Sequence, residues 1–252
     1  MDLKLNGKKA LVTGGGSGLG AEIAKALSAE GVDVAINYIV DEENVLRFAE
    51  SLHKKYGTAC IAVKGDVSCP KDVTSNVDEI VAKMGKIDIL INNAGIWPTA
   101  YVKDMEDEDW DRTLSINLSG AFYMSKRVVQ HLINRKSDGK IISIVSQAAF
   151  HGSTSGHAHY AASKGGLVAF TVSLAREVAK NNITVNAVAP GIMDTLMLKD
   201  AQERGNEYAS RIPLGRVADP AEIADVVVFL ASCKADYITG ATIDVSGGML
   251  MR

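Results

Sequence analysis

Short apolar runs alternate with longer amphipathic segments along the whole chain of 252 residues. The apolar runs are rich in Val and Ile and lack clean polar alternation, so both faces of the strands they form should be buried, as in a parallel sheet covered by helices. Seven runs have the length of strands, at residues 9–13, 32–37, 60–65, 87–95, 140–146, 183–191 and 242–248. Segments between them, such as 19–31 and 43–57, have helical spacing. The pattern predicts a single doubly wound α/β domain over residues 1–252, with ligands at the carboxyl ends of its strands.

Two helix starts can be located from their residues. In "ADPAEIADVVVFLAS", Asp219 is expected to cap a helix, Pro220 to take its first position and Glu222 to complete a capping box. The acidic run "DMEDEDWD", residues 104–111, is expected to be a solvated helix start.

Composition narrows the class of protein. The chain is 47% hydrophobic and 23% charged, which suits one sizeable core, and its net charge of −3 offers no basic field for nucleic acid or an anionic membrane. Cys60, Cys69 and Cys233 are odd in number and lack Cys-x-x-Cys spacing. The chain shows neither a signal peptide nor a run of about 18 apolar residues. We therefore expect a soluble cytoplasmic protein with reduced thiols, and no nucleic-acid or membrane partner.

A glycine-rich turn follows the first predicted strand, in "VTGGGSGLGAEIA". Gly14, Gly18 and Gly20 follow the spacing G-x-x-x-G-x-G, which allows a tight turn and lets backbone N–H groups approach a phosphate at a helix N-terminus. Asp66, after the third strand, could accept a hydrogen bond from an adenine amino group. Taken alone, the motif leaves open a tight turn without a ligand.

Tyr160 and Lys164 stand four residues apart in "HYAASKGG", so a helix would place them on one face. An ammonium near a phenol favours the phenolate, and we expect it to lower the pKa of Tyr160 toward working pH. Such a phenol can exchange a proton with a carbonyl or an alcohol. The adjacent Gly165 and Gly166 weaken a helix, which predicts close approach of another backbone, from the cofactor strand or a partner subunit.

A bare Tyr-x-x-x-Lys spacing also occurs on ordinary surface helices. Ser146 supplies the context, because it ends the fifth predicted strand and its hydroxyl should emerge at the carboxyl edge of the sheet beside the glycine-rich turn. Ser146, Tyr160 and Lys164 are therefore expected to converge on one crevice.

With these motifs in order, the sequence resembles the classical short-chain dehydrogenase/reductase family, in its 3-oxoacyl-carrier-protein-reductase-like subgroup. The matching stretches are "TGGGSGLG" (13–20), "GDV" (65–67), "NNAG" (92–95), "INLSG" (116–120), "IVSQ" (144–147), "YAASK" (160–164) and "NAVAPGIMDT" (186–195). The resemblance covers essentially the whole chain. It implies a seven-stranded parallel sheet flanked by helices, a nicotinamide cofactor, and hydride transfer between the nicotinamide and a substrate carbon.

The resemblance also implies roles for individual residues. Tyr160 is the acid/base, Ser146 holds the substrate oxygen, Lys164 binds the cofactor ribose, and Asn117 positions a water that relays protons to Lys164. The implied cofactor contacts are Gly14, Gly16, Ser17, Gly18, Leu19, Gly20, Asn37, Tyr38, Asp66, Val67, Asn93, Ala94, Gly95, Tyr160, Lys164, Pro190, Gly191, Ile192 and Thr195.

The choice between NAD and NADP depends on the end of the second strand. An acid there would hold the ribose diol of NAD, and a base there or before Gly18 would hold the phosphate of NADP. The chain has Tyr38 and Ile39 at the strand end and Ser17 before Gly18, so it has neither device. Residues 41–43, all acidic, are expected to be first-turn acids of the next helix. Family members with "NY" here tend toward NADP, and our prediction is NAD(P) with a lean to NADP.

Substrate contacts are predicted from residues near the catalytic set. The candidates are Trp97, Ser146, Gln147, His151, His157 and Met193, with a polar substrate lid at about residues 192–214. Solvated loop histidines and plain packing of Trp97 are the competing interpretations. His157 and His159 form a His-x-His pair without an evident third ligand, so no metal site is predicted.

These features predict an NAD(P)-dependent oxidoreductase acting on a small or medium hydroxyl/carbonyl compound of the sugar, polyol or cyclic ketone type. The alternative is a 3-oxoacyl-[acyl-carrier-protein] reductase, for which Arg135, Lys136 and Arg176 resemble a basic docking surface. A non-catalytic protein that senses nicotinamide redox state is disfavoured because the catalytic residues are all present. By the resemblance, residues 117–133, 160–179 and the C-terminal tail would be buried between subunits of a homotetramer.

Overall fold

A computed structural model describes residues 2–194 and 209–251, and its centre is a seven-stranded sheet in the order β3-β2-β1-β4-β5-β6-β7. Every strand pairs in parallel with its neighbours. The strands are β1 (Lys9–Thr13), β2 (Asp33–Tyr38), β3 (Cys60–Lys64), β4 (Ile89–Asn92), β5 (Gly139–Ile144), β6 (Ile183–Pro190) and β7 (Thr242–Val245). The prediction of a doubly wound parallel sheet is confirmed. The strand order reverses between β1 and β4, and such folds bind ligands at that switch point.

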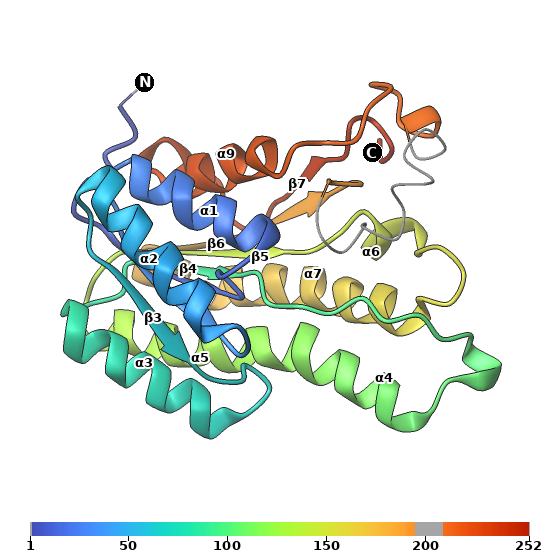
Figure 1. The fold of residues 1–252 in the computed structure, drawn as a ribbon, viewed down its shortest axis with the longest axis horizontal. Helices are drawn as coiled ribbons and strands as arrows, with labels where there is room; N and C mark the ends of the chain where they lie inside the picture. The colour runs from blue at the N-terminus through green and yellow to red at the C-terminus, as the bar shows by residue number, and fades with distance from the viewer. Residues whose placement is uncertain (1, 195–208, 252) are drawn as a thin grey trace.

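Helices cover both faces of the sheet (Figure 1). One face carries α1 (Gly18–Ala29), α2 (Glu42–Tyr56) and α9 (Pro220–Ala231), and the other carries α3 (Pro70–Met84), α5 (Gly120–Asn134) and α7 (Ala158–Val178). The shorter elements are η1 (Val102–Asp104), α4 (Asp107–Leu114), the π-helical turn η2 (Ser115–Ser119), α6 (Ala148–His151), η3 (Ala179–Asn181) and η5 (Cys233–Ala235). No helix in the described ranges is long and apolar enough to span a membrane.

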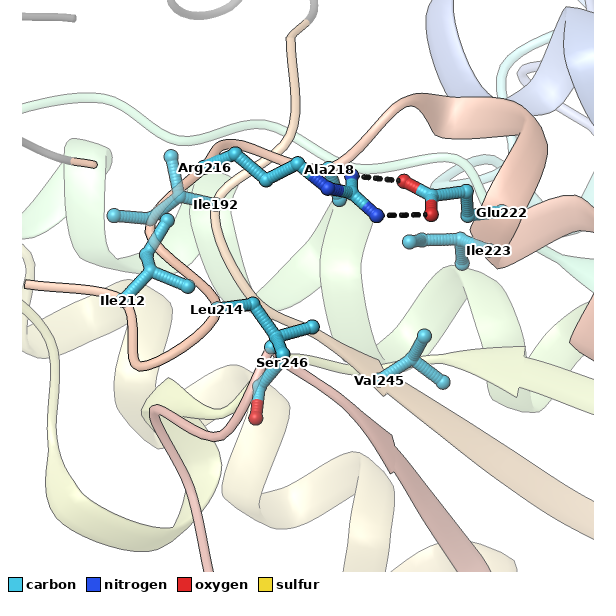
Figure 2. Close-up of a pocket in the computed structure, with 10 residues that line it drawn as sticks. Ile192, Ile212, Leu214, Arg216, Ala218, Glu222, Ile223, Val245 and Ser246 are labelled. Atoms are coloured by element: carbon cyan, nitrogen blue, oxygen red, sulfur yellow. Dashed lines mark hydrogen bonds and ion pairs between the residues drawn. The ribbon is translucent and has the colours of Figure 1, made fainter. Parts of the chain in front are cut away.

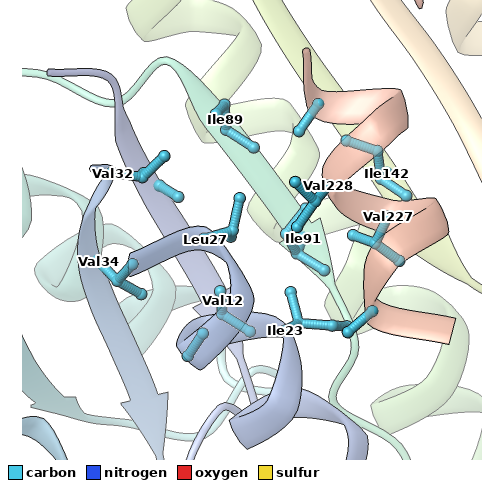
Figure 3. Close-up of a cluster of buried hydrophobic side chains, with 14 of the residues drawn as sticks. Val12, Ile23, Leu27, Val32, Val34, Ile89, Ile91, Ile142, Val227 and Val228 are labelled. Atoms are coloured by element: carbon cyan, nitrogen blue, oxygen red, sulfur yellow. The ribbon is translucent and has the colours of Figure 1, made fainter. Parts of the chain in front are cut away.

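Each central strand sends alternate side chains into two separate cores. Val12, Ile91 and Ile142 pack with α1 and α9 on one face (Figure 3). Their chain neighbours Leu11 and Leu90 pack with α3, α5 and α7 on the other. Burial of such a side chain contributes about 1.5–3 kcal/mol. Burial on both faces explains why the strands show no polar alternation.

The predicted start of α9 is confirmed in detail. Asp219 accepts a hydrogen bond from the N–H of Ala221 at 2.9 Å, and Glu222 accepts one from the N–H of Asp219 at 3.0 Å. The side chain of Arg216 donates to Glu222, and this pairing lowers the pKa of Glu222 to about 2. The acidic run is also placed as predicted, with Asp107, Glu108 and Asp109 in the first turn of α4. The three cysteines are unpaired.

Candidate active site

The glycine-rich turn joins β1 to α1 at the switch point and is closed too tightly for side chains. Gly14 has φ +60°, and a Cβ there would lie 3.0 Å from the Cα of Ala94. A Cβ on Gly20 would lie 2.3 Å from the carbonyl oxygen of Gly14. The first turn of α1 contains no acid, so no side-chain charge in that turn would oppose an anion at its N–H groups. The residues present therefore fit the pyrophosphate of a dinucleotide.

Asn93 holds this turn in place. Its Nδ2 donates to the carbonyl oxygens of Thr13 at 3.0 Å and Gly14 at 3.1 Å. The Thr13 hydroxyl accepts from the N–H groups of Asn93 and Ala94 at 2.9 and 3.0 Å. The amide of Asn93 thus ties the end of β4 to the glycine-rich turn. Its predicted contact with the cofactor stays a prediction.

We expect Gly20→Ala to weaken nicotinamide cofactor binding by about tenfold or more, because overpacking costs about 1–3 kcal/mol and here pushes on the turn itself. Fluorescence titration of the reduced cofactor measures the change. Gly165→Ala is the matched control, since its Cβ would meet only the carbonyl oxygen of Ala149 at 3.6 Å. Equal affinities of the two variants would contradict a phosphate-binding role for this turn.

The residues predicted to contact the adenosine part of the cofactor make hydrogen bonds mainly to other protein groups. Asn37 is buried, and its Nδ2 donates to the carbonyl of Gly65 at 2.9 Å and to Asn76 Oδ1 at 2.8 Å. Tyr38 and Val67 are also buried, and burial raises the pKa of Tyr38. Asp66 Oδ1 accepts from the N–H and the hydroxyl of Ser68. Asn37 therefore holds β2 against β3, and cofactor contacts at this end stay predictions.

The catalytic candidates do converge. Tyr160 and Lys164 lie on α7, with the Lys164 Nζ 5.7 Å from the centroid of the Tyr160 ring. The same amine is buried and donates to the carbonyl of Ile144, the last residue of β5, at 2.8 Å. Ser146 follows that strand, and its side chain lies close enough to the Tyr160 phenol to lower the pKa of that phenol. Tyr160 itself remains partly exposed.

Asn117 lies in the π-helical turn η2, a kind of local distortion that is frequent at functional sites. Its Oδ1 accepts from the N–H of Ile96 at 2.8 Å, and its Nδ2 donates to the Ile96 carbonyl at 3.0 Å and to Ser163 Oγ at 3.1 Å. A Cβ on Gly95 would lie 3.2 Å from Asn117 Oδ1 and 3.6 Å from the Lys164 amine. The end of β4, η2 and α7 therefore meet at one point.

The predicted lowering of the Tyr160 pKa is wrong for the free chain, in which that pKa is raised. Burial raises the pKa of Tyr160, and the nearby Ser146 side chain opposes the rise. Burial also lowers the pKa of Lys164, to about 8. Helical spacing predicts the distance between the two groups but not their loss of water, which penalises both charged forms. A phenol that stays protonated at neutral pH is suited to donating a proton to a carbonyl oxygen.

Within this chain the glycine pair after Lys164 does not approach the cofactor strand, and close approach of a partner subunit stays a prediction. A Cβ on Gly166 would lie 2.9 Å from Leu118 Cδ2, so that glycine makes room for a side chain of η2 and not for a backbone. Gly165 has only an ordinary contact with Ala149. Neither contact involves the strand that would hold the cofactor.

The segment after β6 is held by backbone hydrogen bonds to β7 and to the segment before α9. The N–H of Gly191 donates to the carbonyl of Val245 at 3.0 Å, and the carbonyl of Ile192 accepts from the N–H of Ala218 at 3.1 Å. Figure 2 shows Ile192, Ile212 and Leu214 around a pocket beside the Arg216–Glu222 pair. Thr195 and residues 195–208 of the predicted lid lie outside the described residues.

The predicted substrate residues fall in different environments. His157 is buried and both ring nitrogens have protein partners, whereas His151 is exposed at the end of α6. Gln147 Nε2 donates to Met249 Sδ at 3.6 Å, and Met193 packs against the core beneath α1 and α9. Trp97 lies beside Tyr160. Within the part of the chain that the structure describes, no three His, Cys, Asp or Glu side chains are grouped to hold a metal ion.

Sequence reasoning missed four residues near the site, Thr99, Thr154, Ser163 and Met249. Thr99 and Thr154 bind the His157 ring, Ser163 bridges Asn117 to α7, and Met249 contacts Gln147. Ser163 lies inside the Tyr-x-x-x-Lys motif and offered a signal by position. The others come from loops or the C-terminal tail and form contacts that no local pattern announces.

Comparisons with known proteins agree with this geometry. A family model described as enoyl-(acyl carrier protein) reductase matches residues 14–250. The 3-oxoacyl-[acyl-carrier-protein] reductase FabG of Thermotoga maritima is 37% identical over 99% of this chain and 100% of that protein. The protein of the same name from Aquifex aeolicus is 39% identical over 99% of this chain and 100% of its own length.

Solved structures agree as well. A short-chain type dehydrogenase/reductase from Mycobacterium marinum superimposes with a TM-score of 0.94 at 30% identity, covering 100% of this chain and 99% of that one. A putative short-chain alcohol dehydrogenase from Sinorhizobium meliloti 1021 gives 0.93 at 32% identity, covering 99% of this chain and 98% of that one. The chain therefore belongs to the short-chain dehydrogenase/reductase family, as an NAD(P)-dependent oxidoreductase that acts on carbonyl and hydroxyl groups.

Proposed function

We propose that this enzyme reduces 3-oxoacyl thioesters to 3-hydroxyacyl thioesters with NADPH. The observation that carries the proposal is the full-length likeness, at 37% and 39% identity, to relatives named 3-oxoacyl-[acyl-carrier-protein] reductase. The likeness favours this alternative over the sugar, polyol or cyclic ketone substrate that the sequence first suggested. The intact group of Asn117, Ser146, Tyr160 and Lys164 gives no support to a purely sensory role.

The geometry suits reduction of a ketone. The bound nicotinamide supplies the hydride to the substrate carbon. The Ser146 side chain lies close enough to the Tyr160 phenol to affect its pKa, so a carbonyl oxygen placed between the two hydroxyls would accept from both. Tyr160 then gives its proton to the oxygen as negative charge develops there. Lys164 would hold the cofactor ribose, and its amine is near enough to the phenol ring to stabilise the resulting phenolate.

The lean to NADP is supported by the acids that follow β2. Asp41 precedes α2 as its N-cap and accepts from the Asn44 amide at 2.7 and 2.8 Å. Glu42 is paired with Lys64 and Glu43 with Arg47. Each acid thus has a partner within the protein, which leaves the ribose diol of NAD without an obvious carboxylate.

The direct test follows cofactor oxidation with acetoacetyl-N-acetylcysteamine, using NADPH and NADH in parallel. We expect turnover of this thioester with NADPH, a smaller kcat/KM with NADH, and no turnover of crotonyl-N-acetylcysteamine, whose double bond presents no ketone oxygen to Tyr160. A polyol and cyclohexanone provide the competing substrates. Higher kcat/KM with either of these, or with the crotonyl thioester, would contradict the proposal.

A carrier-protein substrate needs a docking surface, and the predicted one is distant from the chemistry. Arg176 is sixteen residues after Tyr160 on α7, which is about 24 Å along the helix axis. Arg135 follows the C-terminal end of α5, and both arginines are exposed. We expect Arg135→Glu/Arg176→Glu to lower kcat/KM for the carrier-protein substrate and to spare the N-acetylcysteamine thioester. Arg47→Glu, on α2, is the matched surface control.

A homotetramer in the cytoplasm completes the proposal. Helix α5 exposes Phe122 and Ile133, at 40% and 39%, and the Phe122 ring contacts Phe170 of α7. Apolar side chains exposed along α5 suit a subunit interface. A monomer in light scattering would contradict this part of the proposal and leave the assigned reaction unaffected.

A further inference from the structure

Two loops beside Tyr160 are joined to each other by direct contacts. The first follows β4 and contains Trp97 and Thr99, and the second precedes α7 and contains Thr154 and His157. The N–H of Ala100 in the first loop donates to the carbonyl of Gly156 in the second at 2.8 Å. We call these contacts, together with those of the His157 ring, the loop clasp.

The His157 ring is the centre of the loop clasp. It is 6% exposed, and its Nδ1 lies 3.1 Å from the carbonyl oxygen of Thr154 and 3.0 Å from that residue's hydroxyl. Its Nε2 lies 3.0 Å from the Thr99 hydroxyl. A carbonyl can only accept, so the proton belongs on Nδ1 and Nε2 accepts from Thr99 in the neutral ring. With both nitrogens engaged, His157 is not placed to bind substrate.

Trp97 is held by this ring. The indole stacks on the imidazole with centroids 4.2 Å apart and planes 11° apart. It also meets the Tyr160 ring edge-on, with centroids 6.4 Å apart and planes at 70°. Trp97 is partly exposed, unlike the histidine beneath it. An apolar surface is therefore fixed beside the acid/base residue and left open on another side.

We propose that Trp97 is a specificity-determining residue that forms an apolar wall of the substrate cleft, and that His157 is a positioning residue acting through it. The group that packs on this wall is the apolar chain attached to the reacting carbonyl, which rests on the proposed function in taking that chain to be an acyl tail. Each methylene moved from water onto the indole should raise kcat/KM by up to about fourfold. The enzyme would then prefer longer tails to the acetoacetyl group.

The test is a ladder of 3-oxobutanoyl, 3-oxohexanoyl and 3-oxooctanoyl thioesters of N-acetylcysteamine. We expect wild-type kcat/KM to rise at each step, mainly through a falling KM. Trp97→Ala should reduce the rise to less than twofold per step, and His157→Ala should do so in part. His157→Phe keeps an aromatic ring stacked on the indole. The rise in kcat/KM with tail length should therefore be larger in His157→Phe than in His157→Ala. Trp110→Phe, on α4, is the matched control and should show the same rise in kcat/KM with tail length as wild type.

A second readout does not depend on turnover. The chain has two tryptophans, so Trp110→Phe leaves Trp97 as the sole emitter. In that background His157→Ala should change the emission of Trp97, and 3-oxooctanoyl thioester should change it more than 3-oxobutanoyl thioester. The proposal would be overturned if kcat/KM of Trp97→Ala still rose with tail length as in wild type. It would also be overturned if the change in Trp97 emission were the same for both thioesters.

Failure of the proposed function has a different signature. If no thioester is turned over, the same variants are measured with 2-butanone, 2-hexanone and 2-octanone. If kcat/KM rises with the chain length of the ketone in wild type and not in Trp97→Ala, the apolar wall is supported and thioester reduction is contradicted. If kcat/KM rises equally with ketone chain length in Trp97→Ala and wild type, or does not rise in wild type, the assignment of Trp97 as an apolar wall is overturned.

Discussion

Tyr160→Phe is expected to lower kcat for carbonyl reduction by about 10²–10⁴-fold, the range for loss of a positioned general acid. The variant removes one hydroxyl and leaves the aromatic ring in contact with Trp97. The glycine-rich turn is held by hydrogen bonds among Thr13, Asn93 and Ala94, which the variant leaves in place, so cofactor affinity should change less than kcat. Steady-state rates and fluorescence titration of the reduced cofactor separate these effects.

Tyr101→Phe is the matched control for that experiment. Tyr101 is 57% exposed in the loop after β4, and removal of its hydroxyl should leave kcat within about twofold of wild type. If Tyr160→Phe retained wild-type turnover of every accepted substrate, Tyr160 would not be the proton donor. The role of Ser146 would then need to be reconsidered as well, since the resemblance implies that it acts on the same substrate oxygen as Tyr160.

Local patterns were sufficient to predict most of the fold. Val and Ile runs predicted the strands because a strand buried on both faces leaves a continuous apolar run, as Leu11 and Val12 show by entering different cores. The start of α9 was predictable because a capping box involves only residues three apart. The predicted fourth strand extended to residue 95 but β4 ends at Asn92, because the following amides turn to bind Thr13.

The candidate site was predictable in its membership but not in its electrostatics. Residues four apart on a helix must share a face, so Tyr160 and Lys164 could be paired from their spacing. The degree of burial is set by β5, η2 and the loop after β4, which are distant in sequence. That burial reverses the expected pKa shift of Tyr160. His157 shows the same limit, because its hydrogen bond to Thr99 and its stacking on Trp97 come from a loop that is distant in sequence.

Lys164→Met is expected to separate activity from stability. The buried amine has its pKa lowered from the usual 10.5 to about 8, so the folded state disfavours the ammonium that the unfolded chain accepts. Below about pH 8 both states are protonated and the fold carries the full cost, about 3 kcal/mol as an upper bound. The cost falls as the pH rises from about 8 to 10.5, and above that both states are neutral. Part of the gain is offset because the Ile144 carbonyl loses its donor.

We therefore expect Lys164→Met to raise the free energy of unfolding at pH 7 by about 1–2 kcal/mol, and to lose that advantage by pH 10.5. In the same variant kcat should fall by at least about 10²-fold, because nothing remains to stabilise the phenolate of Tyr160 or to hold the ribose. Urea unfolding of the cofactor-free protein at both pH values measures the first effect. Lys126→Met, at an exposed position on α5, should change stability by less than about 0.5 kcal/mol at either pH. If Lys164→Met destabilised the protein equally at both pH values, the amine would contribute to stability through packing and its bond to Ile144. The folded state would then not bear the cost of a buried ammonium at pH 7.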